Sequence, residues 1–119
     1  MDTIELKNLA NPDETRSLPK THIAVVNFKG TSVMQATFQP GWTWSECIKP
    51  TANTQSCQVA HINYVISGRM MIAMDNGIQK EMNPGDVAVI PPGHDAWVLG
   101  DEPCTIIDFS AGKLYGKPS

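Results

Sequence analysis

The stretch Gly85-Asp-Val-Ala-Val-Ile-Pro91-Pro-Gly93 decides the fold class of this chain. It holds a short apolar run, residues 87–90, between two turn signals that are rich in Pro and Gly. The same alternation of a short β-rich run and a turn signal recurs on both sides, about every 8–12 residues, which is typical of an all-β sandwich or barrel. The predicted strands are 22–28, 33–38, 42–48, 59–66, 69–74, 78–82, 87–90, 97–99 and 104–109.

The length of 119 residues indicates a single domain. Residues 1–20 are polar and contain two prolines, so we predict an N-terminal arm over 1–20 and one β-barrel domain over 21–119. The arm has room for one short strand at 4–6 or for a turn or two of helix at 5–10.

Charge and cysteine content narrow the function classes. The net charge is -3 and there is no run of Lys or Arg, which argues against nucleic-acid binding. The apolar runs are far shorter than the ~20 residues that span a membrane, and the N-terminus has no signal-peptide pattern. Three cysteines favour a reduced, cytoplasmic protein. A Cys47–Cys57 disulfide stays open as an alternative.

Residues 36–109 resemble the cupin superfamily, whose members are small barrels of two packed sheets. The second motif of that family, Gly-(x)5-Pro-x-Gly-(x)2-His, is matched at Gly85, Pro91 and Gly93. The first motif, Gly-(x)5-His-x-His-(x)3-4-Glu-(x)6-Gly, is matched in fragments at Gly41 and Gly68. The resemblance implies a double-stranded β-helix, or jelly-roll barrel, and raises the expectation of a homodimer.

The metal ligands of that family, three His and one Glu, are replaced in this chain. Counted from Gly41, their places are taken by Cys47, Lys49, His61 and Ala96. Counted back from His61, the His-x-His places fall instead on Gln55 and Cys57. We favour the register from Gly41, because the Pro-Gly pair that opens it also fits, and the second register stays open. The chain has only three His, so the usual set cannot be built.

Side-chain alternation along the strands predicts what the barrel interior contains. Cys47 and Lys49 share one face of a predicted strand, and His61 and Asn63 share one face of another. With the position equivalent to the last motif His, these residues predict a ligand pocket made of Cys47, Lys49, His61, Asn63 and Ala96. Trp42 and Trp44 fall on the opposite face, where we expect them to pack on the outer sheet or at a subunit interface.

A transition metal is the second candidate for this interior, with Zn, Fe, Ni or Cu as the ions that suit His and Cys ligands. The candidate ligands are His61, Cys47, Cys57 and His94. Cys57 and His61 lie roughly 13 Å apart along an extended strand. They therefore share an ion only if Cys57 lies on a loop that folds back.

Three functions from different classes follow. The first is a barrel that binds a small molecule without the usual three-His–one-Glu metal site. The second is a metal-dependent enzyme, of isomerase or oxygenase type, with a His/Cys site. The third is a non-catalytic oligomeric or regulatory domain. One barrel fold hosts many activities, so the fold alone does not choose between them or show that the protein is an enzyme.

Overall fold

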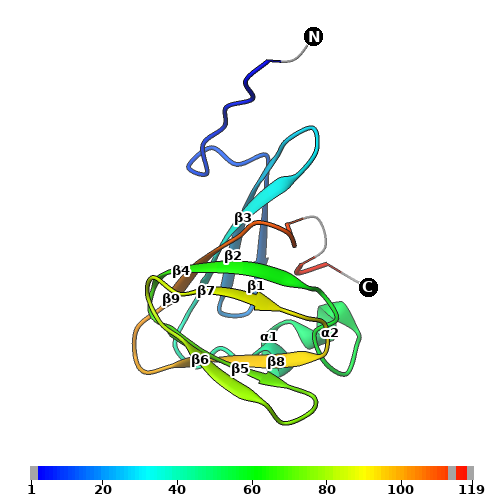
Figure 1. Ribbon diagram of the computed structural model, residues 1–119, viewed down its shortest axis with the longest axis vertical. Helices are drawn as coiled ribbons and strands as arrows, with labels where there is room; N and C mark the ends of the chain where they lie inside the picture. The colour runs from blue at the N-terminus through cyan, green and yellow to red at the C-terminus, as the bar shows by residue number, and fades with distance from the viewer. Residues whose placement is uncertain (1–2, 113–114, 118–119) are drawn as a thin grey trace.

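The computed structural model describes residues 3–112 and 115–117, and within them the chain is almost entirely β (Figure 1). The elements are β1 (Glu14–Leu18), β2 (Thr21–Asn27), β3 (Ser32–Phe38), α1 (Trp44–Cys47), α2 (Lys49–Ala52), β4 (His61–Ser67), β5 (Arg69–Met74), β6 (Gln79–Met82), β7 (Val87–Ile90), β8 (His94–Leu99) and β9 (Cys104–Asp108). The helices are single turns, and the prediction of an all-β chain is confirmed.

The strands form two antiparallel sheets that enclose the core. The larger sheet has the order β1-β2-β3-β9-β4-β7, and the smaller has the order β6-β5-β8. In Figure 1 the smaller sheet lies below β4 and β7 and closes that side of the barrel. The two sheets are joined at Gly68, which lies between the end of β4 and the start of β5.

Burial alternates along the strands that face the interior, as the pleat of a strand requires. The alternation is complete in β3 and β9 and continues through β8. On β4 it buries His61, Asn63 and Val65 and leaves Ile62 and Tyr64 exposed. The inner face of β4 therefore brings an imidazole and an amide into an otherwise apolar interior.

The predicted strand at 42–48 is wrong, because this segment forms α1. Thr43 is the N-cap of that helix, and its Oγ1 accepts a hydrogen bond from the backbone N–H of Glu46 at 3.1 Å. A Thr followed three residues later by a Glu is a helix-start signature, and here it prevails over the apolar alternation. Cys47 and Lys49 consequently do not share a strand face. Lys49 begins α2, and its Nζ donates to Gln55 Oε1 at 3.3 Å.

The N-terminal stretch contains a strand that the sequence pattern did not indicate. β1 pairs with β2 in register from Glu14↔Val25 to Leu18↔Thr21. Residues 3–8 form neither the strand at 4–6 nor the helix at 5–10, and residues 1–2 lie outside the described residues. The division into an arm and a barrel domain stays a prediction. Among the described residues, no helix has the length and apolar content needed to cross a membrane.

Gly68 is the position where the fold leaves least room for a side chain. Its φ is +77°, and an added Cβ would overlap the carbonyl oxygen of Pro103 and lie 2.6 Å from Cys104 Cα. Gly77 has a similar φ of +94°, but nothing lies within 4 Å of an added Cβ there. The two glycines therefore share the backbone requirement and differ in crowding.

We predict that Gly68→Ala lowers the free energy of unfolding by about 1–3 kcal/mol more than Gly77→Ala, because only the first substitution forces two backbone segments apart. Urea unfolding followed by circular dichroism measures both variants. Equal losses would show that Gly68 is needed for its backbone conformation alone.

Candidate metal centre

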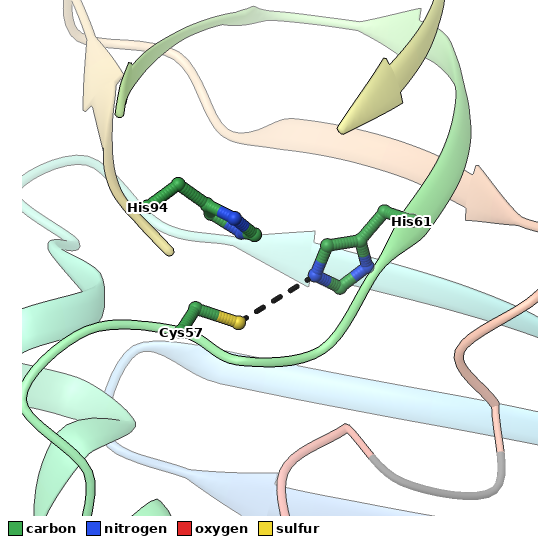
Figure 2. A group of neighbouring side chains, drawn as sticks. All are labelled: Cys57, His61 and His94. Atoms are coloured by element: carbon green, nitrogen blue, oxygen red, sulfur yellow. Dashed lines mark hydrogen bonds between the residues drawn. The ribbon is translucent and has the colours of Figure 1, made fainter. Parts of the chain in front are cut away.

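Three buried side chains meet at one point inside the barrel, as Figure 2 shows. Cys57, His61 and His94 each offer one ligand atom, and these atoms all lie within 4.8 Å of one another. Cys57 Sγ lies 3.7 Å from His61 Nε2, and the centroids of the two imidazole rings are 5.2 Å apart. Such a group of one thiol and two imidazoles has the donors that zinc and neighbouring transition metals prefer.

Cys57 reaches this point because the loop after α2 folds back onto the start of β8. The helix ends at Asn53, whose φ of 60° turns the chain. Cys57 then makes backbone hydrogen bonds to the turn before β8: its N–H donates to His94 O at 2.7 Å, and its carbonyl accepts from Gly93 N at 2.7 Å. The condition set by the sequence, a loop that folds back, is therefore met. Of the two motif registers, the one counted back from His61 predicted Cys57 as a ligand, and Cys57 is the cysteine that joins the group.

Asp108 orients His61 from behind. His61 Nδ1 donates to Asp108 Oδ2 at 2.6 Å, and this carboxylate is completely buried. Its other oxygen, Oδ1, accepts from the backbone N–H groups of Ser110 at 2.8 Å and Ala111 at 2.7 Å. With Nδ1 donating, Nε2 carries the lone pair and faces Cys57. A carboxylate behind an imidazole is the usual second layer of a metal site.

A backbone carbonyl orients His94 in the same way. His94 Nδ1 donates to the carbonyl oxygen of Pro91 at 2.9 Å, which leaves Nε2 free to bind. Burial lowers the pKa of His94, so the neutral ring that a metal requires is favoured. The turn that the sequence motif marked, from Pro91 to Gly93, therefore supplies the acceptor that sets this ring.

The Cys57 thiol is neutral without a cation beside it. Burial raises its pKa to about 11, and the charge of Asp108 adds to this shift. A bound dication reverses the preference, because it stabilises the thiolate directly. Binding of a metal at this point therefore displaces a proton from Cys57.

Of the remaining predicted pocket residues, two line the cavity and two lie elsewhere. Asn63 and Ala96 line a cavity of about 30 Å³ together with His61 and His94. Cys47 and Lys49 are not among its lining residues, because the strand that was to carry them is helical. Cys47 is buried but does not join the Cys57–His61–His94 group.

Sequence reasoning placed two residues of this interior on the wrong face and gave no role to a third. Trp42 and Trp44 are buried and line the cavity, so the expectation that they lie on the outer face is wrong. Asp108 had a usable signal, because strand alternation places it on the same face as the buried Cys104 and Ile106. A carboxylate on an apolar inner face requires a partner.

All three cysteines are free and buried, so the alternative of a Cys47–Cys57 disulfide is not realised. Burial raises the pKa of Cys104 to about 11, as it does for Cys57.

Comparison with known proteins identifies the fold. No family model matches the chain, and no curated protein matches it. A protein of unknown function from Rhizobium leguminosarum is similar in structure, with a TM-score of 0.65 and 17% identity over 92% of this chain and 98% of that one. A Cupin 2 conserved barrel domain protein from Salinispora arenicola has a TM-score of 0.61 and 17% identity, covering 91% and 88%. The polyketide cyclase RemF from Streptomyces resistomycificus has a TM-score of 0.62 and 16% identity, covering 90% and 78%.

These similarities show that the chain has the cupin type of β-barrel, as its sequence motifs predicted. The identities are low, so they define the architecture and leave the chemistry to the residues of this chain. The homodimer implied by the resemblance stays a prediction.

We predict that Asp108→Asn lowers the free energy of unfolding of the metal-free protein by about 2–3 kcal/mol, because the amide loses the charged acceptor that His61 requires. Glu81→Gln is the control, since it weakens an exposed pair with Arg69 at 3.4 Å and should cost less than about 1 kcal/mol. Urea unfolding in the presence of a chelator measures both. Similar losses in the two variants would contradict the role of the buried pair.

We also predict that iodoacetamide modifies the native, metal-free protein slowly at about pH 7.5, because all three thiols are buried and burial raises the pKa of Cys57 and Cys104 to about 11. Unfolding in urea should make all three cysteines reactive. Mass spectrometry counts the modified thiols. Modification of only one cysteine in urea would indicate a disulfide, and fast modification before unfolding would contradict their burial.

Proposed function

We propose that this chain binds one transition-metal ion through Cys57, His61 and His94, with one coordination position open toward the small cavity. The observation that carries the proposal is the convergence of three buried ligand atoms within 4.8 Å. A tetrahedral ion with a metal–sulfur bond of about 2.3 Å and a metal–nitrogen bond of about 2.0–2.1 Å would separate these donors by about 3.6 Å. The distance of 3.7 Å between Cys57 Sγ and His61 Nε2 agrees with this value.

The hydrogen bonds around the group support the same conclusion. Each imidazole has its Nδ1 engaged, one by Asp108 and the other by Pro91, so both rings present Nε2. This removes most of the freedom that the ligands would otherwise lose on binding. An arrangement of three protein ligands and one open position is that of catalytic zinc sites rather than of closed structural ones.

The proposal joins two of the functions expected from the sequence, a metal site made of His and Cys and a small-molecule pocket. When bound, such an ion supplies Lewis acidity to a ligand that fills the open position. The chain supplies the walls: a buried cavity of about 30 Å³ in which His61 and His94 lie beside mostly apolar side chains. Since solvent is largely excluded, polar contacts made there are strengthened.

The test is metal binding with matched variants. We expect the wild type, stripped with a chelator and re-exposed to Zn²⁺, to retain one ion per chain by elemental analysis. Cys57→Ala and His94→Ala should each weaken Zn²⁺ binding about 100-fold or more, because each removes one of three protein ligands.

The controls are Cys47→Ala, which removes a buried thiol outside the group, and His22→Ala, which removes an exposed imidazole. Both should bind Zn²⁺ as the wild type does. The proposal is overturned if the wild type retains no ion, or if Cys47→Ala weakens binding as much as Cys57→Ala.

A further inference from the structure

The outer surface of the larger sheet carries a group of exposed apolar side chains beside its free edge. Ile62 and Tyr64 point outward from β4, and their register partners on β7 are Val89 and Val87. Phe109 follows β9 and donates its backbone N–H to the carbonyl oxygen of Ile62 at 3.0 Å. All five residues are exposed. They are called the outer apolar face below.

No charged side chain interrupts the outer apolar face. Ile107 on β9 is half-buried and pairs with Tyr64, so the apolar surface is continuous from β7 through β4 to β9. Among the described residues of these three strands, no outward-facing position is charged. A lack of charge together with Tyr and Phe side chains is typical of the centre of a protein–protein interface.

The face ends at an open strand edge. β7 is the last strand of the larger sheet, where it pairs with β4. Exposed edges are usually protected by Lys, Pro or a β-bulge. Residues 87–90 read Val-Ala-Val-Ile, and their register with β4 is regular. An unprotected apolar edge next to an apolar face indicates a surface that another chain covers.

The apolar area of this face matches what one partner contributes to a stable dimer. Its five side chains are 41–78% exposed, which leaves on the order of 100 Å² of apolar surface uncovered on each. A standard interface takes about 800 Å² from each partner, and about 65% of a homodimer interface is apolar. The face therefore supplies the roughly 500 Å² of apolar surface that such an interface requires.

We infer that the outer apolar face is the contact between two copies of this chain, which pack sheet against sheet around a two-fold axis. A two-fold axis sets the same patch of both copies against each other, so the patch has to be complementary to itself. The chain has a net charge of -3, and a face bearing part of that charge would repel its copy. The outer apolar face avoids this repulsion. The inference goes beyond the proposed function and does not depend on the metal.

The experiment is sedimentation velocity of the wild type and of Val89→Lys. We expect the wild type to sediment as a dimer at about 10 µM. Val89→Lys should raise the dissociation constant of the dimer about 100-fold or more, because each copy would bury an unpaired charge against the other. Val89 is 78% exposed, so the substitution leaves the core intact, and circular dichroism verifies the fold.

Leu6→Lys is the matched control. Leu6 is apolar and 89% exposed, and it belongs to the N-terminal stretch that runs away from the barrel in Figure 1. This variant should dimerise as the wild type does. Hydrogen exchange of the wild type at about 1 and 100 µM locates the contact without a substitution, because mass action fills the dimer at the higher concentration. Protection should increase in residues 61–67 and 87–90.

The outcomes decide between a second copy and other occupants. A wild type that remains monomeric at 100 µM overturns the inference, and binding of that monomer to phosphatidylcholine vesicles would assign the face to a lipid surface. A dimer that Val89→Lys leaves intact, or that Leu6→Lys weakens equally, also overturns it, because the contact then lies elsewhere. Removal of metal with a chelator should leave the dimer unchanged, so failure of the metal site and failure of this contact are distinguishable.

Discussion

The interior of the barrel is organised by one buried carboxylate. Asp108 is fully enclosed, and a buried charge is tolerated only when its lone pairs are engaged. Its partners come from two places: His61 on β4, and the backbone of Ser110 and Ala111 immediately after β9. The same oxygens therefore tie two neighbouring strands together and turn the chain inward after β9. They also fix which nitrogen of His61 points toward Cys57. The orientation of the His61 ring therefore follows from the hydrogen bond that the buried Asp108 needs.

Of the other two members of the group, Cys57 depends on contacts that are distant in sequence, whereas His94 depends on a local one. Cys57 is held by backbone hydrogen bonds to Gly93 and His94, and His94 is held by the carbonyl of Pro91. The contact of Cys57 with Gly93 and His94 brings the loop after α2 against the turn between β7, in the larger sheet, and β8, in the smaller one. The convergence of the three side chains is therefore a property of the closed barrel. No single strand or loop could produce it alone.

These dependencies explain which features the sequence could predict. The strands and the inward position of His61 and Asn63 follow from local turn signals and from the period of two along a strand. The helix at Trp44–Cys47 was missed because the capping contact of Thr43 competes with an alternation that also suits a strand. That error reversed the expected positions of Trp42 and Trp44 and placed Cys47 and Lys49 in the pocket. Cys57 depends on His94, which lies 37 residues later in the chain (94 − 57). Asp108 depends on His61, which lies 47 residues earlier. No local sequence pattern encodes either contact.

The charges of the site show why a dication suits this interior. Without an ion, the Cys57 thiol and the His94 ring are both neutral, and Asp108 is engaged behind His61. A dication with a Cys57 thiolate and the Asp108 carboxylate nearby would bring the formal charge of this set to zero, a condition that a low-dielectric interior favours. An anionic fourth ligand would add one negative charge to this buried set, so a neutral donor suits the fourth position better.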